Sequence, residues 1–249
     1  MDYPKWTSSA AAPKPEVANI ENEINVDLKE LLKGKRVALV GPSSHIVGKG
    51  LGDKIDSYDI VVRIGQFFQI PEKMYPDLGK KTNIVAHSFN QFQIPKCNKT
   101  FLNSIDMVMC CMSSNNLKNQ QENFFKSLTT KYYNINDDYF RKICKETGTA
   151  VNSGFAAIVV LLQYEIKELF ITGYSFYNMG KYGDVYYDEY EKEAKSTAIK
   201  VKGEPKNITP KQARSDLHNQ KSQIERFSKL IEEYDVISLD DFLTQNFKK

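Results

Sequence analysis

Residues 35–65 read KRVALVGPSSHIVGKGLGDKIDSYDIVVRIG, and the order of apolar and turn residues in them predicts how the chain begins to fold. The first apolar run, residues 37–40, is too short for a core helix and rich in β-branched residues, which is typical of a buried strand. Small turn residues follow at 41–44, and an amphipathic segment then leads to a second strand-like run at 59–63. This order predicts a β-turn-α-β unit of a parallel sheet.

The rest of the chain alternates between strand-like and helix-like segments. We expect strands at residues 83–87, 105–112, 131–134, 168–172 and 235–239, and helices at 25–32, 115–128, 139–145, 155–164 and 217–234. The alternation predicts an α/β fold, a single Rossmann-like domain at residues 23–249 with a mostly parallel central sheet. Residues 1–22 are rich in proline, and we expect them to form a disordered tail or linker.

Composition and charge narrow the class of protein. The chain has 249 residues, of which 26% are charged, and this suits one soluble globular core. Its formal net charge of +3, without a long Lys/Arg run, argues against nucleic acid as a partner. The longest apolar run, residues 155–162, is too short to span a bilayer, and the N-terminus lacks the apolar core of a signal peptide. We therefore expect a cytoplasmic protein without a transmembrane segment.

The pattern of metal-binding residue types is also informative. The four cysteines, Cys97, Cys110, Cys111 and Cys144, show no C-x-x-C spacing. This spacing argues against a zinc site or a disulfide framework and suits a reducing compartment. No Asp-x-Asp stands at the end of a predicted strand, so we expect no metal at the site.

Two stretches carry the residue types of a binding site. The turn at residues 41–44 follows the first predicted strand, and the crevice at the carboxyl end of a parallel strand commonly binds a nucleotide. It has neither G-x-G-x-x-G nor the Gly-Lys-Ser/Thr of a P-loop, so an ordinary turn remains the alternative. Asn152, Ser153 and Gly154 precede a helix that is apolar on nearly every face. The free N–H groups of such a helix start favour an anion, although a plain N-cap explains the same residues.

Residues 174–190 are rich in tyrosine, with aspartate and asparagine between them. Aromatic faces beside carboxylates and amides commonly line sugar sites. We expect Tyr174, Tyr177 and Tyr182 to lie on the sugar or acceptor side, with packing under a loop as an equal alternative. The charged stretch at 191–206 is expected to form a mobile lid.

Three other positions carry expectations of their own. His45 is expected to be a turn residue near the nucleotide. His87 ends the third predicted strand, and either faces the acceptor or is an ordinary exposed histidine. Asp240 and Asp241 are adjacent near the C-terminus, and we expect them to form the solvated start of a helix.

Taken together, these stretches resemble the sialyltransferases of glycosyltransferase family 29. Residues 37–63, with VALVGPSS, GLG and YDIVVRI in this order, resemble the large sialyl motif, and residues 79–83 continue it. Residues 152–177, with NSGFAAIVVLL and then ELFITGYSFY, resemble the small sialyl motif. His218 and the helix after it stand where the very small motif lies. The order and spacing of three motifs are more specific than any one of them.

The resemblance implies a fold and a reaction. Members of this family have a GT-A-variant, Rossmann-like fold and transfer an acidic sugar from its CMP ester to a glycan hydroxyl, with inversion and without a metal. The donor implied here is CMP-sialic acid or a CMP ester of a related keto-sugar acid such as KDO, and no further cofactor is implied. His218 is the implied base, because an imidazole titrates near neutral pH; a surface histidine without a task is the alternative.

The resemblance also implies which residues hold the donor. The implied nucleotide-sugar contacts are Gly41, Pro42, Ser43, Ser44, Arg63, Gly65, Asn152, Ser153, Gly154, Gly173 and Tyr174. The N–H groups at 152–154 and the hydroxyls of Ser153, Ser43 and Ser44 are the donors expected for the departing phosphate. Arg63 either pairs with the donor's carboxylate or makes a structural ion pair.

The sequence departs from the family pattern at several positions. Pro42 and Gly65 stand where the family often has asparagine, and Gln223 stands where the very small motif has an acid, the next acid being Glu225. The motif cysteines and the membrane anchor of animal members are also missing, which fits a bacterial, viral or protist member. These departures keep open a non-catalytic nucleotide or glycan binder with the same fold. A Rossmann-like methyltransferase is disfavoured, because the first turn is not glycine-rich.

Overall fold

The computed structural model describes residues 24–65, 69–90, 94–112, 118–176 and 219–247. Seven strands form one sheet in the order β5-β4-β3-β2-β1-β6-β7, and every neighbouring pair is parallel. The strands are β1 (Arg36–Val40), β2 (Ile60–Ile64), β3 (Ile84–His87), β4 (Met107–Cys110), β5 (Lys131–Asn134), β6 (Glu168–Thr172) and β7 (Ile237–Leu239). The predicted single α/β domain with a parallel sheet is confirmed, and each predicted strand is present.

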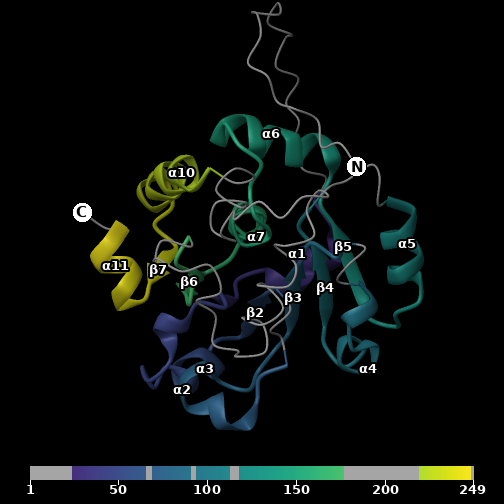
Figure 1. Ribbon diagram of the computed structural model, residues 1–249, viewed down its shortest axis with the longest axis horizontal. Coiled ribbons are helices and arrows are strands. Elements are labelled where there is room, and N and C mark those ends of the chain that lie inside the picture. Colours follow the sequence, from purple (N-terminus) through teal and green to yellow (C-terminus); the bar gives the residue numbers. More distant parts are fainter. Residues whose placement is uncertain (1–23, 66–68, 91–93, 113–117, 177–218, 248–249) are drawn as a thin grey trace, which may run out of the picture.

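Helices cover both faces of this sheet (Figure 1). The α-helices are α1 (Val26–Leu32), α2 (Gly52–Asp56), α3 (Tyr75–Leu78), α4 (Lys99–Leu102), α5 (Lys118–Lys126), α6 (Asp137–Thr147), α7 (Ser153–Leu161), α10 (Gln220–Glu233) and α11 (Asp241–Phe247). Short 3-10 turns are η1 (Ser44–Ile46), η2 (Glu72–Met74) and η3 (Ile94–Lys96). In Figure 1, β7 with α10 and α11 lies at one side of the molecule, and α5 lies at the other.

The two faces of the sheet pack into separate apolar clusters, as the alternation of side chains along a strand requires. In β1, Val37 and Leu39 join the cluster that contains α7, whereas Ala38 and Val40 join the cluster that contains side chains of α2 and α3. Burial on both faces explains why the strands read as continuous apolar runs rather than as alternating ones.

The buried helix α7 forms the centre of the larger cluster. Its sequence SGFAAIVVL has no polar face, and most of its side chains are fully buried. A helix that is apolar on all sides belongs in a core, as the sequence predicted. The side chain of Asn152 caps its first turn and so fixes where the helix begins.

Some expectations are refined and others lie outside the described residues. The segment between β2 and β3 contains η2 and α3, which none of the predicted helices covers. The four cysteines, all of them among the described residues, form no disulfide with one another, and Cys110 and Cys111 are buried. Within the described ranges, no helix is both long and apolar enough to cross a membrane. The predicted tail at 1–22, the predicted lid at 191–206, Tyr177, Tyr182 and His218 all lie outside the described residues.

Candidate functional site

The strand order reverses direction next to β1. From β1 the chain proceeds through β2, β3 and β4 to β5, and it then returns to pair β6 with the free side of β1. The loops that follow β1 and β6 therefore diverge, and in open α/β sheets ligands bind in the crevice that such a switch point leaves at the carboxyl ends of the strands. The site is thus expected where residues 41–44 and 173–176 lie.

Two glycines bring these loops into direct backbone contact. The N–H of Gly41 donates to the carbonyl of Thr172 at 2.8 Å, and the N–H of Ser43 donates to that of Gly173 at 2.8 Å. A Cβ added to Gly41 would lie 2.3 Å from the carbonyl oxygen of Gly173, and one added to Gly173 would lie 2.4 Å from that of Gly41. Gly173 also has a φ of +65°, which favours glycine. Both glycines are therefore needed for the loops to approach each other.

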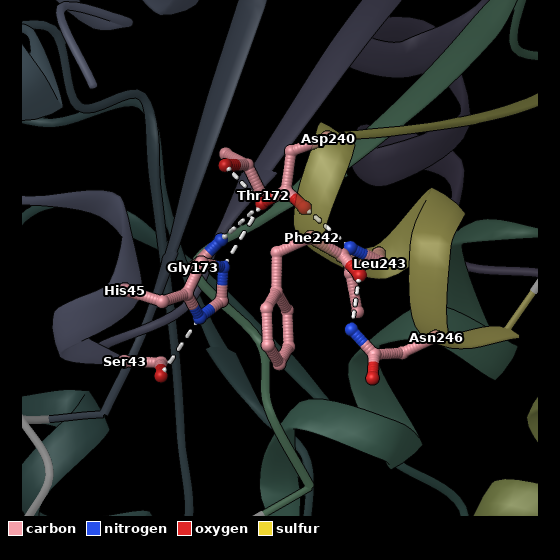
Figure 2. Close-up of polar contacts among 8 residues, drawn as sticks. All are labelled: Ser43, His45, Thr172, Gly173, Asp240, Phe242, Leu243 and Asn246. Carbon is pink, nitrogen blue, oxygen red and sulfur yellow. Dashed lines mark hydrogen bonds and ion pairs between the residues drawn. The ribbon is translucent and has the colours of Figure 1, made fainter. Parts of the chain in front are cut away.

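A buried polar chain runs across the end of the sheet beside these glycines (Figure 2). His45, in η1, has its Nδ1 atom 3.0 Å from the hydroxyl of Ser43 and its Nε2 atom 3.1 Å from Oδ2 of Asp240. The ring of Phe242 stacks on the imidazole at a centroid distance of 4.1 Å. The side chains of His45 and Asp240 are only 6% and 5% exposed. This chain of hydrogen bonds, from Ser43 through His45 to Asp240, joins the first turn after β1 to the residue that follows β7.

Asp240 is the hub of this chain. Its Oδ2 atom also accepts hydrogen bonds from the hydroxyl of Thr172 at 2.8 Å and the N–H of Gly173 at 3.1 Å. Its Oδ1 atom accepts from the N–H of Leu243 and caps α11. Burial alone would raise the pKa of Asp240, but the hydrogen bonds from His45, Leu243 and Thr172 outweigh it and hold the pKa below its ordinary value.

The prediction of a solvated helix start at Asp240 is therefore wrong about its environment, although a helix does begin there. The pairing of Ile171 with Leu239 places Asp240 next to the end of β6, where buried donors surround it. The sequence shows two adjacent acids, and it cannot show that one of them has these distant partners.

The ionised carboxylate of Asp240 fixes the tautomer of His45. A carboxylate accepts hydrogen bonds and donates none, so the hydrogen between Asp240 and His45 belongs to Nε2 of the imidazole. In the neutral ring Nδ1 is then an acceptor, and the hydroxyl of Ser43 must donate to it. The hydroxyl hydrogen of Ser43, expected at the phosphate, is thus directed to His45.

A second group of polar side chains lies at the N-terminus of α7. The Oδ1 atom of Asn152 accepts from the N–H of Phe155 at 2.9 Å and from the hydroxyl of Tyr174 at 2.5 Å. A Cβ on Gly154 would lie 2.5 Å from the Tyr174 ring, so glycine is needed there for this contact. A Cβ added to Gly41 would lie 3.3 Å from Cα of Tyr174. The polar side chains at the start of α7 are therefore next to the paired loops at Gly41 and Gly173.

Sequence reasoning did not assign a partner to Gln223, and the structure places it at this helix start. It is fully buried on α10, and its Oε1 atom accepts from the backbone N–H of Asn152 at 3.2 Å. The side-chain amide nitrogens of Gln223 and Asn152 are buried without a hydrogen-bond partner among the described residues. Glu225, the other candidate for the missing acid, is exposed and lies 3.9 Å from Lys221. Buried amide groups without a partner are uncommon, and they often mark a place where a ligand or water binds.

Arg63 is held by the protein backbone. It is 1% exposed, and its Nη2 atom donates to the carbonyls of Leu78 at 2.9 Å and Lys81 at 2.8 Å. Its Nε atom donates to the hydroxyl of Thr82 at 2.9 Å. These contacts give Arg63 a structural task, with backbone carbonyls and the hydroxyl of Thr82 among its partners. Gly65, just after β2, has a φ of +84° and donates its N–H to Ala86.

His87 lies at the end of β3 and is buried, so the expectation of an ordinary exposed histidine is wrong. Its Nδ1 atom accepts from the N–H of Phe89 at 2.9 Å, and Phe89 has an unusual φ of +43°. Burial lowers the pKa of His87 to about 4, so the ring is neutral at physiological pH.

The remaining predicted contacts are half-buried: Pro42 and Ser44 follow β1, and Ser153 is the first residue of α7. The structure therefore brings Gly41, Ser43, Gly173, Tyr174 and the N-terminus of α7 together. Arg63 instead contacts the end of α3, through the carbonyl of Leu78.

Comparisons with solved structures find the same fold. The sialyltransferase CstII from Campylobacter jejuni, in complex with cytidine-5'-monophosphate, matches with a TM-score of 0.55 and 19% identity over 86% of this chain and 84% of its own. An α-2,3-sialyltransferase from Campylobacter jejuni in apo form matches with a TM-score of 0.55 and 18% identity over 88% of this chain and 82% of its own. A mammalian sialyltransferase matches with a TM-score of 0.52 and 12% identity over 85% and 70%.

No model of a known protein family matches the sequence, and no curated protein matches it significantly. At identities of 12–19% the likeness to these sialyltransferases concerns the fold.

Proposed function

We propose that this protein is a CMP-sugar glycosyltransferase of the sialyltransferase type. It would move sialic acid, or a related keto-sugar acid such as KDO, from its CMP ester to a glycan hydroxyl, with inversion and without a metal. One observation carries the proposal: the stretches that resemble the large and small sialyl motifs meet at the switch point of the sheet, through Gly41 and Gly173. The fold is that of solved sialyltransferases, one of them in complex with CMP.

The N-terminus of α7 suits the departing CMP. Negative charge grows on the phosphate as the sugar leaves, and fixed donors at that place lower the barrier. The buried amide groups of Asn152 and Gln223 and the first N–H groups of α7 are donors of this kind. They are held by Tyr174 and by α10, so little reorganisation is needed when charge develops.

The departures from the family pattern agree with this proposal in physical terms. Gly65 adopts a positive φ, which glycine and asparagine tolerate better than other residues, so the turn is kept while the amide side chain is lost. Gln223 is fully buried, and an ionised acid there would need a charged partner, whereas an amide can bond to Asn152. The non-catalytic binder remains the alternative that the experiment below must exclude.

His218 is proposed as the base for the acceptor hydroxyl. It directly precedes Asn219, whose N–H donates to the hydroxyl of Thr149 at 2.9 Å and whose side chain caps α10 at Ser222. The chain therefore enters α10 near the segment that leads into α7. An imidazole is the side chain most often used to accept a proton from a hydroxyl near neutral pH.

The test is release of CMP from CMP-sialic acid in the presence of EDTA, with and without glycan acceptors. Release that survives EDTA and falls by roughly a hundredfold or more in His218→Ala supports the proposal. Lys221→Ala, an exposed change on the first turn of α10, is the matched control and should keep full activity. A strict need for a divalent cation would contradict the metal-free mechanism. CMP binding with neither transfer nor donor hydrolysis would favour the binder instead.

A further inference from the structure

We propose that His45 is a positioning residue for Ser43, held in place by Asp240, and that it takes up a proton when a nucleoside monophosphate binds at the switch point. The inference rests on the proposed function and adds a task for His45 and Asp240, to which the sialyl-motif resemblance gives none. It follows from the order of donors and acceptors in the chain Ser43–His45–Asp240 (Figure 2).

With a neutral imidazole, Ser43 is badly arranged for a phosphate. A serine hydroxyl has one hydrogen, and here it is directed to Nδ1 of His45 over 3.0 Å. The hydroxyl oxygen of Ser43 can then offer only lone pairs to a phosphate, and these repel the phosphate oxygens. The backbone N–H of Ser43 is also occupied, because it donates to Gly173.

Protonation of the imidazole reverses the direction of this bond. One proton from solvent forms an N–H bond at Nδ1 of His45, and this group then donates to the oxygen of Ser43. The hydroxyl of Ser43 rotates, and its hydrogen becomes free to donate to a phosphate oxygen. No other bond is made or broken, and the bond from Nε2 to Asp240 is kept.

The surroundings of the imidazole suit this exchange. Phe242 stacks on one face and carries no charge, and Thr172 contacts the same carboxylate as His45 does. Asp240 forms an ion pair with the ring when the imidazole is protonated. A dianion bound close by stabilises a cation, so it favours the form of the ring that carries a proton on both nitrogens.

Titration calorimetry of the whole protein with CMP tests the inference. Binding is measured at pH 7.5 in two buffers that differ in ionisation enthalpy, which gives the number of protons taken up. We expect a net uptake approaching one proton for the wild type and none for His45→Gln, whose amide nitrogen can still donate to Asp240. Because CMP is already almost fully ionised at this pH, its own phosphate adds little uptake. Cytidine, which has no phosphate, should bind without uptake.

Two variants assign the proton. His218→Ala should keep the uptake, which separates His45 from the proposed base. Ser43→Ala should weaken CMP binding and flatten its pH dependence, because the free hydroxyl is then missing in both protonation states. In the wild type, affinity for CMP should fall by up to about tenfold per pH unit between pH 7 and 8.5, since one proton is bound with the ligand. If His45→Gln does not fold, the pH dependence of CMP affinity in the wild type and in Ser43→Ala still tests the inference.

The outcomes separate the inference from the proposed function. If the wild type does not bind CMP, the proposed function fails. If it binds CMP without proton uptake, or if His45→Gln or Ser43→Ala keeps the wild-type pH dependence, the positioning role is overturned while the proposed function stands.

Discussion

The backbone N–H of Asn152 donates to the side-chain carbonyl of Gln223 across 3.2 Å, and this bond joins the start of α7 to α10. Both residues are buried, so neither group can turn to water if the other is removed. The sequence had left open whether Gln223 or Glu225 takes the place of an acid in the very small motif. The bond assigns the inward position to Gln223.

Gln223→Ala should therefore destabilise the fold. The N–H of Asn152 would be buried without a partner, which costs about 1–3 kcal/mol in the free energy of unfolding. Urea unfolding measures this loss. Glu225→Ala is the matched control on the same helix, and its exposed side chain predicts a change within about 0.5 kcal/mol. Equal losses for the two variants would show that α10 is not anchored through Gln223.

Gly173→Ala should lower the free energy of unfolding by more than the positive φ of this residue alone explains. The added Cβ would meet the carbonyl of Gly41 at 2.4 Å, and two backbones would have to separate. Gly34→Ala is the control, because Gly34 has a similar φ of +68° but open space around it. The control should lose roughly 1–2 kcal/mol for the left-handed conformation, and Gly173→Ala roughly 3 kcal/mol or more. Urea unfolding of both variants compares them, and a loss in Gly173→Ala no larger than the control's would argue against tight contact of the loops.

The sequence was sufficient for the sheet and for half of this site. Continuous apolar runs such as residues 37–40 allow few interpretations other than a buried parallel strand, and the small residues after β1 indicated the crevice. Local patterns also located the start of α7, because an N-cap depends on neighbours in sequence.

The rest of the site depends on contacts between distant residues. His45 and Asp240 are 195 positions apart, and the residues next to each of them in the sequence do not predict that they are in contact. Asp240 beside Asp241 has the composition of an exposed helix start. Only the pairing of β7 with β6 places Asp240 in the interior. The same holds for Arg63, because the backbone carbonyls among its partners leave no mark in the sequence.

The stability of the protein should fall between pH 6.5 and pH 4, in part because of His87. Its pKa is lowered to about 4 by burial, whereas in the unfolded chain it returns to its ordinary value near 6.5. In this window the unfolded state binds more protons than the folded state, so the free energy of unfolding decreases as the pH falls. The contribution of one such group is at most about 3 kcal/mol.

His87→Asn tests this contribution. The side-chain oxygen of asparagine can replace Nδ1 as the acceptor for the N–H of Phe89, and asparagine does not titrate. Urea unfolding at pH 7.5, 6 and 5 should show a smaller pH dependence in the variant than in the wild type. An unchanged pH dependence would mean that His87 titrates normally in the folded protein.

Asp240→Asn should weaken both the fold and the binding of CMP. The carboxylate accepts hydrogen bonds from His45, Thr172 and the N–H of Gly173 through one oxygen, and an amide group in its place cannot accept at both ends. Hydrogen bonds to a charged group are worth about 1.5–3 kcal/mol, and we expect a loss of this size near pH 7.

The acid side of this effect has a definite sign. The pKa of Asp240 is lower in the folded protein than in the unfolded chain, so its contribution is fully present above pH 4 and is lost as the pH falls through the folded value. The difference in free energy of unfolding between wild type and Asp240→Asn should therefore shrink below pH 4. Asp59→Asn is the control: its exposed carboxylate accepts the N–H of Arg36 at the other end of β1, so CMP binding should stay unchanged. If Asp240→Asn also leaves CMP binding intact, the hydrogen bonds that join Ser43, His45 and Asp240 contribute to stability alone.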